Sequence, residues 1–132
     1  MFINEIDSLK AFEILKLKEN SILIDVRTSF EWNTVGVPDL SLFNKDPIFI
    51  EWPTIMDSNF FNNFKDELDK NFFKCDNLIF ICKSGVRSRM AAKMSIDFGY
   101  KNIFNVLDGF EGNNLSFKGW LNNKLPWKKI NF

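Results

Sequence analysis

Cys82 is the residue in this sequence best placed to do chemistry. It closes the predicted strand 77–82 (NLIFIC), whose last five residues are apolar, and it is followed by Lys83-Ser84-Gly85 and a helical stretch from about Val86. A short connection between a strand and a helix turns its backbone N–H groups inward and forms a concavity of positive potential. These amides, the helix dipole and Arg87 favour a thiolate, so Cys82 is predicted to be a nucleophile and not an inert core cysteine.

The absence of histidine from the chain removes most other routes to catalysis. A Ser-His-Asp triad, a Cys-His pair and a His-ligated zinc site are excluded. Cys75 and Cys82 are the only thiols, so a zinc site of four cysteines is excluded too, and no metal or cofactor is expected. The two cysteines stand at opposite ends of the same predicted strand, roughly 20 Å apart at ~3.3 Å per residue. A disulfide needs Cα atoms within ~7 Å, so the two are not expected to pair.

Length and charge indicate one soluble domain over residues 1–132. The chain has 45% apolar residues, and its 17 basic side chains balance 17 acidic ones. Zero net charge gives no general attraction to nucleic acid or to an anionic membrane. No apolar run approaches the ~18 residues of a membrane span, and the N-terminus lacks the pattern of a signal peptide. We therefore expect a cytoplasmic protein whose thiols stay reduced.

Apolar strand-like segments alternate with helical ones along the chain, which predicts an α/β fold with a parallel sheet covered on both faces. Ligands bind beyond the carboxyl ends of the strands in such sheets, where Asp25, Cys82 and Leu107-Asp108-Gly109 are expected. The predicted strands are 21–26, 47–52, 77–82 and 103–107. The predicted helices are 8–18, with Ser8 as N-cap and Leu9, Phe12 and Leu15 on one side; a helix capped by Asp57 or Ser58 that contains Phe61, Phe64 and Leu68; and 86–98, with Gly99 as C-cap.

Together these motifs resemble the rhodanese-like domain family. The matches follow the family's order over about residues 5–127, and the central C-x-x-G-x-R-S pattern is the most specific. They are Asp25-Val26-Arg27 with Glu31-Trp32, Cys82-Lys83-Ser84-Gly85-Val86-Arg87-Ser88, Leu107-Asp108-Gly109, and Trp120 with Leu125-Pro126. The resemblance implies a parallel sheet of about five strands flanked by helices on both faces.

The resemblance also implies sulfur transfer. Cys82 would take sulfane sulfur from a donor such as thiosulfate, hold it as a persulfide, and pass it to a thiol or cyanide acceptor or to a sulfur-relay protein. By position, the backbone amides of Lys83, Ser84, Gly85, Val86 and Arg87 would line the pocket and stabilise the outer sulfur. The Lys83 and Arg87 side chains would bind an anionic donor, although Arg87 could equally lock the loop. Asp25, Arg27 and Glu31 are expected to buttress the loop without touching substrate.

Other functions remain open on the same fold. Related cell-cycle phosphatases and arsenate reductases carry one more residue than the C-x-x-x-x-R loop from Cys82 to Arg87, and the shorter loop favours sulfur. A non-catalytic module that binds partners is a further alternative, but such modules often lack the cysteine that this chain keeps. A relay of sulfur between proteins would need the same persulfide as an enzyme acting on small donors.

The sequence departs from the family's pattern in three places. The usual G-H-I-P-G-A reads Val35-Gly36-Val37-Pro38-Asp39-Leu40, without the histidine, and residues 41–55 are longer than usual. The usual pair of glycines after the last strand reads Gly109-Phe110, and extra residues precede Trp120. Because the stretch 110–119 follows the end of a strand, we hypothesise that it forms a rim or lid over the Cys82 pocket; the alternative is a passive surface loop.

Overall fold

A parallel five-stranded sheet forms the centre of the computed structural model, which describes residues 2–53, 57–115 and 118–131. Its strands follow the order β1-β6-β5-β2-β4, and a separate antiparallel pair joins β3 to β7. The strands are β1 (Asn4–Ile6), β2 (Ser21–Asp25), β3 (Val37–Pro38), β4 (Ile48–Phe49), β5 (Asn77–Ile81), β6 (Asn102–Val106) and β7 (Trp127–Lys128). The helices are α1 (Ser8–Leu17), α2 (Ser29–Val35), α3 (Ser58–Asn71), α4 (Val86–Asp97), α5 (Gly119–Asn122) and the 3₁₀ turn η1 (Ser41–Phe43).

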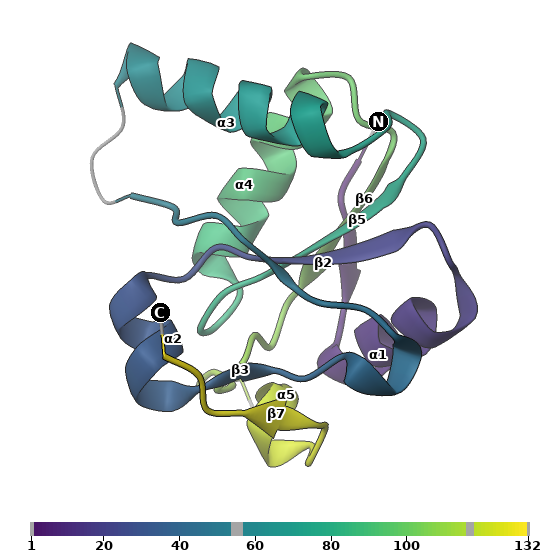
Figure 1. Ribbon diagram of the computed structural model, residues 1–132, viewed down its shortest axis with the longest axis vertical. Coiled ribbons are helices and arrows are strands. Elements are labelled where there is room, and N and C mark those ends of the chain that lie inside the picture. Colours follow the sequence, from purple (N-terminus) through teal and green to yellow (C-terminus); the bar gives the residue numbers. More distant parts are fainter. Residues whose placement is uncertain (1, 54–56, 116–117, 132) are drawn as a thin grey trace.

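Helices cover both faces of the sheet, as predicted. Helices α3 and α4 lie on one side, and α1, α2 and α5 lie on the other (Figure 1). Strand β5 is buried along its whole length. Its alternate residues enter different cores: Leu78, Phe80 and Cys82 pack toward α3 and α4, whereas Ile79 and Ile81 pack toward α1 and α5. Burial on both faces explains why its sequence is an unbroken apolar run.

Helix α1 begins differently from the sequence prediction, and both α1 and α3 pack differently from it. Asp7 and not Ser8 caps α1, because its carboxylate accepts the amide of Lys10 (2.8 Å). The predicted stripe of α1 is also wrong at Leu9, which is 52% exposed, since the helix turns Ala11, Ile14 and Leu15 inward. Asp57 caps α3 as predicted; its inward residues are Phe64 and Leu68, while Phe61 is largely exposed.

The predicted strand at 47–52 is present but short. Only Ile48 and Phe49 pair as β4, yet the amides of Ile50 and Trp52 continue along β2 by donating to Asp25 and Val26. The long stretch after Leu40 thus supplies η1 and an edge strand, with residues 54–56 outside the described part. Helix α4 ends at Asp97 with Phe98 as its C-cap, and Gly99 follows with a φ of +97°. No helix in the described ranges is both long and apolar enough to cross a membrane.

Candidate active site

Cys82 lies directly beyond β5, at the base of the loop that leads into α4. Its side chain is buried, with 1% exposed. The amide of Gly85 donates a hydrogen bond to Cys82 Sγ (3.2 Å), and Ser88 Oγ lies 3.2 Å from the same sulfur. Two donors therefore converge on the sulfur when it is a thiolate, because a thiolate can only accept.

The loop around Cys82 is held by close backbone contacts that only glycine permits. Gly85 has a φ of +101°, and a Cβ placed there would lie 2.4 Å from the carbonyl oxygen of Leu107. Gly109 has a φ of +64°, and its Cβ would lie 2.3 Å from the carbonyl oxygen of Lys83. The loop and the turn after β6 therefore touch backbone to backbone, and each requires a glycine opposite the other.

Arg87 forms an ion pair with Glu31, a contact that can lock the loop; whether Arg87 also binds a donor stays a prediction. The guanidinium meets both carboxylate oxygens of Glu31, at 2.7 and 3.0 Å. Glu31 is fixed in turn by a capping box, in which the Thr28 hydroxyl accepts the Glu31 amide and the Glu31 carboxylate accepts the Thr28 amide. This arrangement ties α2 to the Cys82 loop.

The ion pair shifts the pKa of both of its partners. Burial raises the pKa of Glu31, but the hydrogen bonds from Arg87 and Thr28 outweigh it and lower that pKa to about 2. The hydrogen bond to Glu31 raises the pKa of Arg87. With Arg87 balanced by a carboxylate, the exposed Lys83 is the cation of the loop most accessible to a donor.

Asp25 and Arg27, which the sequence analysis assigns to the support of the loop, are completely buried. Arg27 Nε and Nη2 donate to the Asp25 carboxylate, and Nη2 also donates to the Gly36 carbonyl (2.8 Å). Its guanidinium carbon lies 4.2 Å from the centre of the Phe110 ring. This buried pair links the end of β2 to the segment that follows β6.

Asp108 organises the turn after β6. Its carboxylate accepts the amide and the hydroxyl of Ser8 (2.9 and 3.0 Å) and the amide of Gly119 (3.0 Å). Burial raises the pKa of Asp108 against the effect of these hydrogen bonds. The carboxylate thus joins α1 and α5 to the end of the sheet where Cys82 lies, and it explains why Ser8 is not available to cap α1.

The described part of the stretch 110–119 borders the Cys82 loop. Asn113 Nδ2 donates to the carbonyls of Leu107 (3.0 Å) and Ser84 (3.4 Å), while Leu115 is exposed. A cavity of about 400 Å³ opens there, lined by Ser84, Gly85, Val86, Arg89, Leu107, Asn113 and Leu115. These contacts place the segment against the Cys82 loop, but Cys82 itself does not line the cavity. A role as a rim or lid of the Cys82 pocket stays a hypothesis, and residues 116–117 lie outside the described part.

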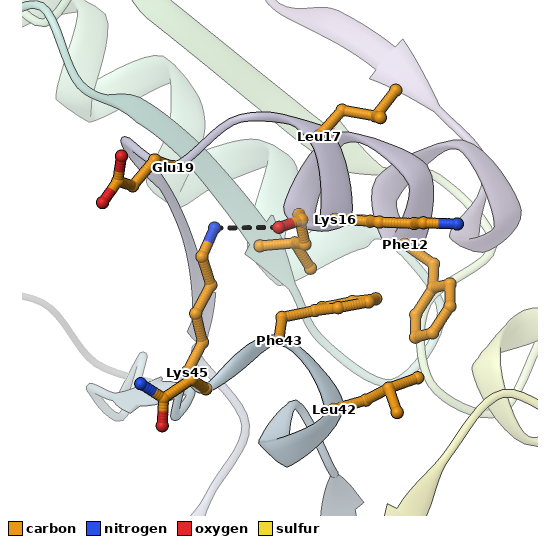
Figure 2. A pocket seen from close by; sticks show the side chains of 9 residues that line it. Phe12, Lys16, Leu17, Glu19, Leu42, Phe43 and Lys45 are labelled. Carbon is orange, nitrogen blue, oxygen red and sulfur yellow. Dashed lines mark hydrogen bonds between the residues drawn. The ribbon is translucent and has the colours of Figure 1, made fainter.

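A second, larger cavity of about 650 Å³ lies between α1 and η1, apart from the predicted site residues. Figure 2 shows Phe12 and Phe43 across it from Lys45, whose ammonium reaches the end of α1. Lys45 Nζ donates to the carbonyls of Leu15, Lys18 and Ser21 at 2.8–3.1 Å, and burial lowers its pKa. Its charge therefore serves as a helix cap, and none of the predicted site residues lines the cavity.

Comparison with known proteins identifies the family. The family model described as STR4 middle domain matches residues 5–131. Rhodanese-like domain-containing protein 17 of Arabidopsis thaliana is 32% identical over 105 residues, covering 80% of this chain and 61% of that protein. The chain is a rhodanese-like domain of the STR4 middle-domain family.

Two further relatives match the rhodanese-like domain almost from end to end. Protein RP600 of Rickettsia prowazekii, described as uncharacterized, is 44% identical over 129 residues, which is 97% of this chain and 99% of RP600. The crystal structure of Rv0390 from M. tuberculosis has a TM-score of 0.83 at 34% identity and covers 98% of this chain and 100% of its own. The α/β fold and the family predicted from the sequence are thereby confirmed.

Among the residues described, no three His, Cys, Asp or Glu side chains gather in a way that could hold a metal ion. The sequence missed the contact of Ser88 with the sulfur; it placed Glu31 as a support of the loop but did not identify Arg87 as its partner. The S/T-x-x-E spacing of Thr28 and Glu31 could have located the start of α2, and with it the carboxylate that meets Arg87. The assignment of Lys83 and the loop amides to substrate binding stays a prediction.

Proposed function

We propose that this protein is a sulfurtransferase in which Cys82 carries sulfane sulfur as a persulfide. The observation that carries the proposal is the environment of Cys82 Sγ, which has the Gly85 amide and the Ser88 hydroxyl each 3.2 Å away at the amino end of α4. Both groups, with the helix dipole, favour a negatively charged sulfur and need no histidine base. Membership of the rhodanese-like family supports the same chemistry.

In the first half-reaction the Cys82 thiolate attacks the outer sulfur of thiosulfate. A new S–S bond forms to Cys82, the S–S bond of the donor breaks, and sulfite leaves with that electron pair. In the second half-reaction a nucleophile such as cyanide or a thiolate attacks the outer sulfur of the persulfide. The bond to Cys82 then breaks, so thiocyanate or a new persulfide departs and the Cys82 thiolate is restored.

The charges around the loop fit a small anion that approaches from solvent. Lys83 is exposed and can attract the donor, while the Gly85 amide, which donates to Cys82 Sγ, and the free amides at the start of α4 would stabilise the outer sulfur. Arg87 acts through its contact with Glu31, which keeps α2 against the loop. A loop of six residues from Cys82 to Arg87 is also short for a tetrahedral phosphate, which favours sulfur over phosphoryl chemistry.

Intact-protein mass spectrometry after brief exposure to thiosulfate, and separately to a low-molecular-weight persulfide, tests the proposal. Wild type should gain one sulfur atom, cyanide should remove it, and Cys82→Ser should gain none. Cys75→Ser is the matched control, because Cys75 is an exposed free thiol at the far end of β5 and its loss should leave the gain unchanged. No gain from any donor in wild type would favour a binding module instead.

A further inference from the structure

One segment of the chain, residues 105–113, forms hydrogen bonds with the outer side of the Cys82 loop. The carbonyls of the loop's first four residues, Cys82 to Gly85, each accept a hydrogen bond from this segment. The amide of Phe110 donates to Cys82 O (2.8 Å), and that of Glu111 donates to Lys83 O (3.0 Å). The remaining two donors are side chains: Asn113 Nδ2 reaches Ser84 O (3.4 Å) and Asn105 Nδ2 reaches Gly85 O (3.1 Å).

These four contacts fix the direction of the loop amides. The N–H of a trans peptide points opposite to the C=O of the same planar unit. Four carbonyls held outward therefore turn the next four amides, those of residues 83–86, toward the concave side of the loop. The Gly85 amide shows this result directly, since it belongs to the same peptide unit as Ser84 O and donates to Cys82 Sγ.

Both asparagines are anchored elsewhere, so they can hold the loop in place. Asn105 is completely buried on β6, and its Nδ2 also donates to the Glu5 carboxylate (2.7 Å). Asn113 Nδ2 also donates to Leu107 O (3.0 Å), and its Oδ1 accepts the Leu115 amide (3.0 Å). Each side chain thus joins a loop carbonyl to a part of the chain with an independent position.

We propose that Asn113 and Asn105 are positioning residues of the sulfur pocket, which orient the amides of the Cys82 loop toward the reacting sulfur. The inference rests on the proposed function, because an anionic outer sulfur is what inward amides would stabilise. Without the donor on Ser84 O, the Ser84–Gly85 peptide can rotate. Cys82 Sγ then loses its hydrogen bond from the Gly85 amide, and the Ser84 carbonyl oxygen can face the anionic sulfur instead.

Asn113→Asp is the sharpest variant, because it keeps the size of the side chain and the Oδ1 that accepts from Leu115, while it removes the Nδ2 donor and adds one negative charge. Asn114→Asp is its matched control, since the neighbouring Asn114 is exposed and receives the same added charge. Two quantities are measured at a temperature well below unfolding. One is the equilibrium between the Cys82 persulfide and glutathione persulfide, and the other is the rate of Cys82 alkylation by iodoacetamide. Alkylation needs no sulfur transfer.

Asn113→Asp should shift the sulfur equilibrium away from Cys82 and slow alkylation, each roughly 2- to 10-fold, as the loss of the hydrogen bond from the Gly85 amide to the sulfur predicts. Asn114→Asp should match wild type. Equal values for the two variants, whether both unchanged or both lowered, would overturn the inference. If Asn113→Asp does not fold, Asn113→Ala removes the same donor without a charge, and wild-type behaviour of that variant overturns it too. A wild type that forms no persulfide refutes the sulfurtransferase proposal, while alkylation still decides the role of Asn113.

Discussion

Replacing Gly85 by alanine should cost more than its backbone angle alone explains. A non-glycine residue in the left-handed region costs about 1–2 kcal/mol. At Gly85 the new Cβ would also lie 2.4 Å from the carbonyl oxygen of Leu107 and 2.9 Å from its carbon, and both are backbone atoms of a neighbouring segment. Overpacking of this kind adds about 1–3 kcal/mol, so the free energy of unfolding should fall by about 2–5 kcal/mol.

Gly99 provides the matched control. Its φ of +97° is close to the +101° of Gly85, but a Cβ added there has no atom within 4 Å. Gly99→Ala should therefore lose only the conformational part, about 1–2 kcal/mol. The difference between the two variants measures the contact between the loop and Leu107.

Urea unfolding gives the two free energies, and mass spectrometry gives the rate at which each variant gains sulfur from thiosulfate. Gly85→Ala should slow this gain roughly tenfold or more, since its amide moves away from the sulfur, while Gly99→Ala should react like wild type. Equal losses of stability together with equal rates would refute the reasoning that the loop is held by this backbone contact.

Three more predictions concern the contacts around the loop. The Glu31 pKa, lowered from 4.5 to about 2, stabilises the fold above pH 4.5, and this contribution is lost as the pH falls toward 2. When the pH is lowered from about 6 to about 3, the free energy of unfolding of Glu31→Gln, measured by urea titration, should therefore fall by about 2 kcal/mol less than that of wild type. A loss as large as that of wild type would contradict the ion pair. Ser88→Ala should slow alkylation of Cys82 roughly 2- to 10-fold, whereas Ser95→Ala, which removes a buried hydroxyl two turns further along α4, should not; equal rates would exclude Ser88 as a donor to the sulfur. Asp25→Ala should lower the free energy of unfolding by about 3–5 kcal/mol, since it leaves the buried guanidinium of Arg27 unpaired, and a urea titration showing less than about 1 kcal/mol would contradict this.

Local sequence patterns were enough to predict β5 and α4, the strand and the helix that flank Cys82. The unbroken apolar run of β5 predicted a strand buried on both faces, and Gly85 followed by a helical stretch predicted the loop and α4. These features depend on residues close together in the sequence, so they could be read without knowledge of the fold. The α/β class follows from them, because apolar strands alternating with helices pack in few ways.

Contacts between distant residues could not be predicted in the same way. Strand β1 has only three residues, two of them polar, and its backbone is ordered by pairing with β6, as Asn4 lies opposite Phe104. The sequence predicts Ser8 as a helix cap because it does not show that Asp108 binds the Ser8 hydroxyl. Likewise, nothing near Arg87 in the sequence indicates that Glu31, 56 positions earlier, is its partner.

The lengths of the strands have a consequence for aggregation. The three central strands have five residues each and include the most apolar segments, whereas the edge strands β1 and β4 have three and two residues. Short edges leave few unpaired backbone groups to recruit another chain. The segment NLIFI has the high β-propensity and low charge of an amyloid-forming sequence, but it lies in the middle of the sheet between β2 and β6. Native molecules should therefore stay dispersed, and self-association should start only after the sheet has opened far enough to release β5.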